Sequence, residues 1–142
     1  MKTPPVTNLT PQAAHDLIKN TPKCIFIDVR SKMEYQFVGH PIGAVNIPWI
    51  DAPDWVQNPN FITDVRNLSL GGIIRNNEAK GIPLLLICRS GVRSLDAGLE
   101  LHNQGIRNIF NIIDGFEGNL DDQHHRGTEA GWRFEGLPWE QG

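Results

Sequence analysis

Short apolar runs that alternate with helix-forming segments constrain the fold of this chain more than any other feature. The runs are "KCIFIDV" at 23–29, "IPLLLIC" at 82–88 and "IRNIFNII" at 106–113. Apolar runs of this length are typical of strands that are buried on both faces. Because helical segments separate them, the sequence predicts an α/β fold in which a mostly parallel sheet is covered by helices on both faces.

The segments between the runs carry helix signals. In "LTPQAAHDLIKN", Thr10 is a candidate N-cap and Pro11 occupies the first helical position, so we expect a short helix. The other expected elements are a short helix over 31–37, a brief strand within 43–48, a long connection with helical pieces over 51–81, and a helix over 93–105.

The helix expected over 93–105 follows the strongest of the predicted strands. Its residues Leu95, Leu99 and His102 share one face, which we expect to pack on the sheet. Gly105 is the expected end of this helix, because glycine commonly closes helices in a left-handed conformation.

The length and composition fit one domain over 1–142, since 142 residues with 39% hydrophobic content are enough to bury a core. We expect the core over about 6–118. The composition then shifts to Gly, His, Asp, Trp and Pro, so we expect an irregular tail over 119–142 that packs on the body through Trp132 and Trp139.

The charge and the cysteine content limit the partners. A net charge of −3 without a basic stripe argues against nucleic acid, and the absence of a signal-like or spanning apolar segment predicts a cytoplasmic protein without a membrane partner. Two cysteines, Cys24 and Cys88, are too few for a disulfide framework. We expect both to be reduced and to lie near opposite ends of the sheet.

The cysteine that ends the predicted strand at 82–88 is followed at once by small and basic residues, "RSGVRS". Ligands of parallel sheets bind beyond the carboxyl ends of the strands. A glycine with positive φ lets such a loop turn several N–H groups toward the sulfur, and two arginines and a helix start favour the thiolate. The predicted site consists of a nucleophile and its anion-binding loop: Cys88, Arg89, Ser90, Gly91, Val92, Arg93 and Ser94.

Other interpretations of these residues exist. Cys88 fits equally a small buried hydrophobe at a strand end, although that role does not require the basic loop. Cys24 has only Lys23 as a basic neighbour, so we interpret it as structural. Asp28 and Arg30 end an adjacent strand, where Asp28 either orients Arg93 or loop N–H groups, or forms a structural ion pair with Arg30.

The histidines and the remaining tryptophans fit structural roles. His124 and His125 stand beside two aspartates but without a second spaced cluster, so we expect a solvated loop and no metal site. His40 and His102 are expected to be structural. No sequence feature indicates a cofactor.

Several short motifs together resemble the single-domain rhodanese (thiosulfate sulfurtransferase-like) family. They are D-V-R at 28–30, E-Y at 34–35, "GHPIGAVNIP" at 39–48, "LLLICRSGVRS" and "NIIDGFEG". The combination is specific although each piece is weak. The chain departs from the family pattern G-H-I-P-G-A at Pro41, which precedes Ile42, so the turn that carries His40 is expected to differ locally.

The resemblance implies a five-stranded parallel sheet with helices on both sides, and a sulfurtransferase activity. Cys88 would take a sulfane sulfur from a donor as a persulfide, and an acceptor such as cyanide or a thiol would remove it. The implied partners are this small donor and acceptor, with a sulfur-relay protein as a further candidate. A basic residue after the cysteine, here Arg89, favours thiosulfate or a polysulfide as the donor.

Two other functions compete with sulfur transfer. Cysteine phosphatases and arsenate-reducing enzymes use a C-x5-R loop, whereas Cys88 and Arg93 enclose four residues, and the tighter loop suits a persulfide better than a tetrahedral phosphate. A non-catalytic rhodanese-like module would bind or carry sulfur or a partner. Such modules have commonly lost the cysteine, which this chain keeps.

Overall fold

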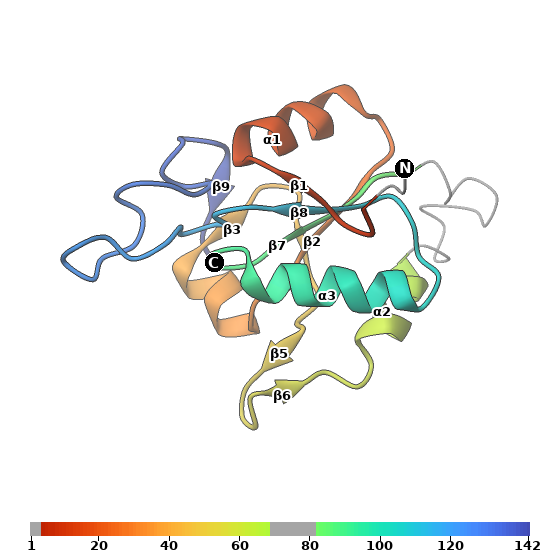
Figure 1. Ribbon diagram of the computed structural model, residues 1–142. Helices are drawn as coiled ribbons and strands as arrows, with labels where there is room; N and C mark the ends of the chain where they lie inside the picture. The colour runs from red at the N-terminus through yellow and green to blue at the C-terminus, as the bar shows by residue number, and fades with distance from the viewer. Residues whose placement is uncertain (1–3, 69–81) are drawn as a thin grey trace.

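A five-stranded sheet forms the centre of the structure, a computed structural model that describes residues 4–68 and 82–142. Every neighbouring pair of strands is parallel, so the predicted α/β fold with its mostly parallel five-stranded sheet is confirmed (Figure 1). In spatial order the strands are β1 (Thr7–Leu9), β8 (Ile109–Ile112), β7 (Leu84–Ile87), β2 (Ile25–Asp28) and β4 (Val45–Asn46).

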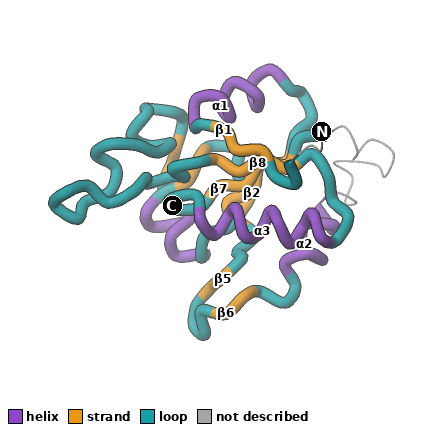
Figure 2. The backbone as a smooth tube through the Cα atoms, in the orientation of Figure 1, coloured by secondary structure: helices purple, strands orange, loops and turns teal. Residues whose placement is uncertain are grey.

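Helices cover both faces of the sheet. In Figures 1 and 2, α1 lies on one side of the strands, and α2 and α3 lie on the other. None of the described helices is both long and apolar enough to span a membrane. The last part of the connection expected over 51–81 lies outside the described residues. The helices are α1 (Pro11–Asn20), the π-helix η1 (Glu34–Val38), α2 (Phe61–Leu68) and α3 (Val92–Asn103).

Neighbouring residues of β7 point to opposite faces of the sheet, as strand geometry requires. Leu84 and Leu86 belong to the apolar cluster that includes residues of α2 and α3, whereas Leu85 and Ile87 belong to the cluster that includes α1. Cys88 continues this alternation and lies in the cluster on the α3 side. The strand therefore directs the sulfur toward the helix that follows it.

The predicted start of α1 at Thr10 and Pro11 and the predicted end of α3 at Gly105 are confirmed, and so is the positive φ expected of Gly91. The Thr10 side-chain oxygen accepts a hydrogen bond from the Ala13 N–H at 3.1 Å, and Pro11 is the first residue of α1. Gly91 precedes α3 with φ 102°, and Gly105 follows it with φ 93°. These left-handed conformations are accessible to glycine at little cost, so both glycines fix where α3 begins and ends.

The face of α3 that packs on the sheet agrees with the predicted one at Leu95, which packs partly buried against the core, and differs from it at Leu99. Leu99 is exposed, whereas a Cβ atom on Gly98 would lie 3.1 Å from Val6 and 3.3 Å from Ile109. The prediction followed the leucines, but close approach of the helix to the sheet selects small residues. The buried residues of the helix are Ser94, Ala97, Gly98 and Leu101.

The C-terminal segment packs on the body beside α1. Its strand β9 (Trp139–Glu140) pairs antiparallel with β3 (His40–Pro41), so Pro41 is accommodated in a two-residue strand. The His40 ring is buried, stacks on Tyr35 with ring centroids 3.7 Å apart, and bonds the Tyr35 carbonyl through Nδ1 at 2.7 Å. The departure at Pro41 therefore leaves His40 in a fixed structural position.

Besides the β3–β9 pair, which lies partly in the segment expected to be irregular, two further strand features were absent from the predictions. β1 pairs with β8 although it is only three residues long and half polar, because an edge strand needs only one neighbour. The long connection also contains a small antiparallel hairpin, formed by β5 (Ile50–Asp51) and β6 (Val56–Gln57). Both features are too short for a period of two to be visible in the sequence.

Replacing Trp132 should lower the free energy of unfolding more than replacing the exposed Phe134 does. The Trp132 ring is 1% exposed, packs against Phe26 with centroids 5.4 Å apart, and its Nε1–H donates to the Pro138 carbonyl at 2.8 Å. We expect Trp132→Ala to lower the free energy of unfolding by about 3–5 kcal/mol in urea titrations. Phe134→Ala, at a 47% exposed position, should lower it by less than about 1 kcal/mol. Equal losses would contradict this placement of Trp132.

Candidate active site

The sulfur of Cys88 lies inside the loop that joins β7 to α3. The side chain is 1% exposed, and its Sγ accepts a hydrogen bond from the Gly91 N–H at 3.1 Å. The Ser94 hydroxyl lies 3.2 Å from the same sulfur, on the first turns of α3. Because the Gly91 N–H donates to the sulfur and the positive end of the helix dipole lies beside it, the position suits a sulfur anion. The single proton of the Ser94 hydroxyl can go either to Sγ or to Asn111 Oδ1.

The carbonyl oxygens of the loop are bonded to other parts of the chain. The Cys88 carbonyl accepts the Phe116 N–H at 2.8 Å, and the Arg89 carbonyl accepts the N–H groups of Glu117 and Gly118 at 2.9 and 3.1 Å. Because of these bonds, the negative ends of the Cys88 and Arg89 peptide dipoles point toward the segment that follows β8. A sulfur anion in the loop is therefore not opposed by these two carbonyls.

Close approach of the two segments requires a glycine at position 115. A Cβ atom there would lie 2.4 Å from the Cys88 carbonyl oxygen, and the residue has φ +60°. A side chain at this position would push the Cys88 loop away from the segment that binds its carbonyls. Gly115 is therefore part of what shapes the loop, although it does not touch the sulfur.

Two asparagines, the buried Asn111 and the exposed Asn8, support the donor groups at the sulfur. The Ser94 hydroxyl lies within hydrogen-bond distance of Asn111 Oδ1 on β8, at 2.5 Å. The Asn111 Nδ2 donates to the Gly91 carbonyl at 3.3 Å and to Asn8 Oδ1 on β1 at 3.1 Å. The Asn111 amide thus bonds both Gly91 in the loop and Ser94 in α3, and links them to the edge strand β1.

Arg93 is bound by a glutamate of η1. Its Nη1 and Nη2 donate to Oε1 and Oε2 of Glu34, both at 2.8 Å, in a bidentate pair. Partial burial alone would raise the pKa of Glu34, but the hydrogen bonds and charge of Arg93, with bonds from Ser31, outweigh it and lower the pKa to about 2. The same bonds raise the pKa of Arg93. The pair is therefore ionised and fixes η1 against the cysteine loop.

Asp28 and Arg30 form the structural ion pair that was one of the two interpretations of these residues. The Arg30 Nη2 donates to Asp28 Oδ2 at 2.7 Å, and its Nε donates to Oδ1 at 3.0 Å, with both side chains fully buried. The Arg30 guanidinium also lies over the Phe116 ring, 4.6 Å from its centroid. Asp28 does not orient Arg93, whose partner is Glu34.

A pocket of about 500 Å³ opens beside the loop. Its lining includes three arginines and two glutamates, so it carries a net positive charge although the whole chain is acidic. Cys88 is not part of the lining, which the loop supplies through Arg89 and Arg93. The lining residues are Glu34, Val38, Ile50, Trp55, Arg89, Arg93, Glu117 and Arg126.

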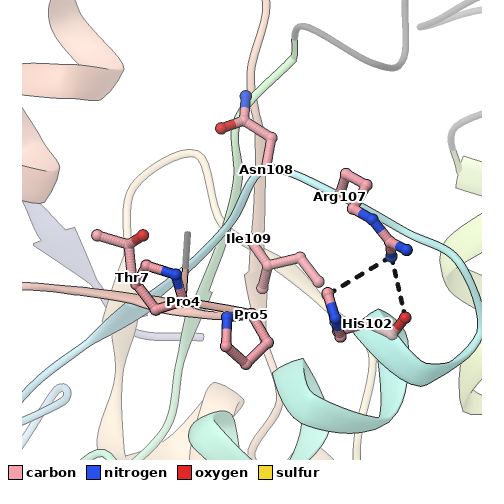
Figure 3. Close-up of a pocket in the computed structure, with 7 residues that line it drawn as sticks. All are labelled: Pro4, Pro5, Thr7, His102, Arg107, Asn108 and Ile109. Carbon is pink, nitrogen blue, oxygen red and sulfur yellow. Dashed lines mark hydrogen bonds between the residues drawn. The ribbon is translucent and has the colours of Figure 1, made fainter. Parts of the chain in front are cut away.

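A second pocket, shown in Figure 3, lies near the start of β8, at the opposite end of that strand from the Cys88 loop. Arg107 borders it and donates from Nη1 to the His102 carbonyl at 3.1 Å. Since Cys88 follows the carboxyl end of β7 and the strands are parallel, this pocket is separate from the sulfur.

The other residues considered in the sequence analysis, Cys24, His124 and His125, lie away from the Cys88 loop. Both cysteines are free thiols, and the β2–β7 register places Cys24 before one strand and Cys88 after the other, so they lie at opposite ends of the sheet. Burial raises the pKa of Cys24. Over residues 4–68 and 82–142, no group of three or more His, Cys, Asp and Glu side chains is arranged to hold a metal ion. His124 and His125 lie in the C-terminal segment.

Sequence reasoning missed several residues of the site. Glu34 belonged to a motif of the resemblance but received no role, and Arg126 lies in a segment that was expected to be an irregular tail. Asn111 carried a usable signal, because a polar residue within an otherwise apolar buried strand requires partners. No sequence signal pairs Asn8 with Asn111, which lie on opposite ends of the chain.

The fold and the loop define an α/β protein with a buried cysteine inside a loop at the carboxyl edge of its sheet, where a backbone N–H donates to the sulfur. The rhodanese-like domain matches residues 10–121. A crystal structure of Rv0390 from M. tuberculosis has a TM-score of 0.81 and 35% identity, covering 96% of this chain and 98% of that chain.

Two curated relatives extend the comparison. An uncharacterized protein of Rickettsia conorii is 31% identical over 141 residues, which cover 95% of this chain and 98% of the relative. The chloroplastic thiosulfate sulfurtransferase 16 of Arabidopsis thaliana is 26% identical over 127 residues, covering 88% of this chain and 85% of the relative. The protein belongs to the rhodanese-like domain family, as its motifs indicated, and has distant relatives named as sulfurtransferases.

Removing the Glu34 carboxylate should change how the free energy of unfolding depends on pH in the acid range. The pKa of Glu34 is about 2 in the folded protein against an ordinary 4.5, so its ionised form stabilises the fold above about pH 4.5. This contribution, up to about 3 kcal/mol, is lost as the pH falls from 4.5 toward 2. In urea titrations we expect Glu34→Gln to be less stable than wild type near neutral pH, and this gap to narrow in acid. A gap that stayed constant down to about pH 2.5 would contradict the ion pair's role.

Proposed function

We propose that this protein is a sulfurtransferase that moves a sulfane sulfur from thiosulfate, a polysulfide or a persulfide to a thiophilic acceptor through a persulfide on Cys88. The observation that carries the proposal is the Gly91 N–H, which donates to Sγ at 3.1 Å, beside the Ser94 hydroxyl at 3.2 Å, whose single proton can go either to Sγ or to Asn111 Oδ1. Fixed donors aimed at an atom that carries negative charge are the main means by which enzymes stabilise such charge.

In the first half-reaction the Cys88 thiolate attacks the outer sulfur of the donor. With thiosulfate, a bond forms between Sγ and the sulfane sulfur, the S–S bond of thiosulfate breaks, and its electron pair leaves with sulfite. Cys88 then carries a persulfide anion. The thiolate and not the thiol is the nucleophile in this step, and the Gly91 N–H lies at hydrogen-bond distance from its sulfur.

In the second half-reaction an acceptor attacks the outer sulfur of the persulfide. With cyanide, a carbon–sulfur bond forms, the bond between Sγ and the outer sulfur breaks, and its electron pair remains on Sγ as the thiolate. Thiocyanate leaves and the cycle closes without a net change in the enzyme. The donors at Sγ again stabilise the leaving thiolate, so the same loop serves both steps.

Two features of the loop favour sulfur over phosphate chemistry. Four residues separate Cys88 from Arg93, and the two terminal nitrogens of Arg93 are both bonded to Glu34. An arginine whose fork is occupied by a carboxylate cannot offer the same two N–H groups to a phosphate. A phosphatase would need to break this pair, whereas persulfide formation uses only the donors close to Sγ.

Exposure to thiosulfate should add one sulfur atom to Cys88. We expect intact-protein mass spectrometry to show a gain of about 32 Da that is removed by cyanide, with peptide mapping placing it at Cys88. Cys24→Ser is the matched control and should gain the same mass, whereas Cys88→Ser should gain none. A wild-type protein that gains no mass would favour the non-catalytic module, and steady hydrolysis of p-nitrophenyl phosphate that is lost in Cys88→Ser would favour a phosphatase.

Arg89 is proposed to attract the donor anion. The side chain is exposed, borders the pocket, and makes no hydrogen bond or ion pair with the residues that the structure describes. A dianion gains more than a monoanion from such a charge, which supports thiosulfate or a polysulfide as the donor.

Replacing Arg89 should therefore weaken the reaction with thiosulfate. We expect Arg89→Gly to lower kcat/KM for thiosulfate by about fivefold to tenfold, with most of the change in KM and less of it at high salt. Arg107→Gly, which removes a charge beside the other pocket, should leave the value within about twofold. An unchanged kcat/KM in Arg89→Gly would remove the argument for an anionic donor.

A further inference from the structure

We propose that Arg126 forms, with Arg89, a second anion-binding position in the pocket beside the Cys88 loop, and that this position binds the carboxylate of an organic thiol acceptor. The inference rests on the proposed function, because it names the class of molecule that removes the sulfur from Cys88. It assigns a specificity role to a residue of the C-terminal segment.

Bonds on both sides of Arg126 hold it in place. The His125 N–H donates to Asp121 Oδ1 at 2.9 Å, and the Gly127 N–H donates to the Glu117 carbonyl at 2.7 Å. The hydrogen bond from the Thr128 hydroxyl, together with that from the His125 N–H, lowers the pKa of Asp121. Arg126 therefore extends from a backbone that is attached to the segment beneath the cysteine loop.

The guanidinium of Arg126 is anchored at one nitrogen. Its Nη1 donates to the Gly118 carbonyl at 2.7 Å, and the side chain is half-buried in the pocket lining. An arginine carries five N–H donors, so this single bond leaves donors for a ligand. A carboxylate fits such a group because the planar fork of arginine matches its two oxygens.

Some charged side chains of the pocket are paired with each other, whereas others are available to a ligand. Arg93 is neutralised by Glu34, so the available positive charges are those of Arg89 and Arg126, against the carboxylate of Glu117. Among the described residues, the Arg89 side chain has no hydrogen-bond or ion-pair partner. An anion that enters the pocket therefore meets a net attraction from two arginines on different segments.

Apolar side chains form another part of the lining. Val38, Ile50 and Trp55 contribute to it, and Trp55 is 55% exposed. A pocket of about 500 Å³ with apolar residues and a few charged ones is typical of sites for small organic molecules. Thiosulfate and cyanide offer no apolar surface, so these residues favour a molecule with a carbon skeleton between its anionic group and its thiol.

The transfer to such an acceptor balances. The acceptor thiol loses its proton to solvent, and its sulfur forms a bond to the outer sulfur of the Cys88 persulfide. The bond between Sγ and the outer sulfur breaks, its electron pair remains on Sγ, and the acceptor leaves as a persulfide anion. Arg126 and Arg89 take no part in bond breaking, since they only bind the carboxylate.

Three small thiols of similar size test the proposal. With the enzyme loaded by thiosulfate, we expect Arg126→Gln to lower kcat/KM for 3-mercaptopropionate by about tenfold and for neutral 2-mercaptoethanol by less than about twofold. Arg126→Gln should react with cationic cysteamine no more slowly than the wild type does. Arg126→Lys should recover most of the loss in kcat/KM for 3-mercaptopropionate. Arg107→Gln is the control for removal of a positive charge and should leave all three values unchanged.

A second measurement does not require turnover. Iodoacetate carries a carboxylate and iodoacetamide does not, so the ratio of their rates of alkylation at Cys88 reports anion binding near the sulfur in a Cys24→Ser background. We expect Arg126→Gln to lower this ratio by about threefold to tenfold, and Arg107→Gln to leave it unchanged.

The two measurements separate this inference from the proposed function. Equal effects of Arg126→Gln on charged and neutral thiols, or an unchanged alkylation ratio, would overturn the role of Arg126. Persulfide formation in wild type would then still stand. Conversely, if thiosulfate adds no sulfur to Cys88, the proposed function fails, and the alkylation ratio alone decides whether Arg126 recruits anions.

Discussion

The hydrogen bonds that hold the carbonyls of the cysteine loop are the interactions on which the rest of the site depends. The carbonyls of Cys88 and Arg89 are bonded to the N–H groups of residues 116–118, while the Gly91 N–H points to the sulfur. If these carbonyls faced the sulfur instead, their negative ends would oppose any anion there. Residues that never touch the sulfur therefore decide which charge the loop can hold, and Gly115 allows their close approach.

The charged groups around this loop have separate tasks. The pair of Arg93 with Glu34 fixes η1 against the loop, and the buried pair of Asp28 with Arg30 stabilises the end of β2. Both pairs are internally neutral, so they hold the site in shape without attracting a ligand from a distance. Under the proposed function, the arginines that line the pocket would supply the attraction, and this would explain how an acidic chain recruits anions at one place.

The sequence was most informative where local signals and chain order agree. The central strands were predictable from apolar runs, and Gly91 was predictable because a loop that curls around a sulfur needs positive φ. The partners of the site were not predictable, because they depend on the packing of distant segments. Glu34 lies 59 residues from Arg93, and Asn8 lies 103 residues from Asn111. Nothing in either local pattern specifies these pairs.

The most direct test of this account compares the two cysteines of the same protein. Cys24 is the more exposed thiol, whereas the sulfur of Cys88 is buried but accepts a hydrogen bond from the Gly91 N–H. The account predicts that a neutral alkylating reagent at neutral pH, followed by peptide mass spectrometry, labels Cys88 at least about tenfold faster than Cys24. If Cys24 reacted as fast as Cys88 or faster, exposure alone would govern reactivity, and the loop would not hold the sulfur as an anion.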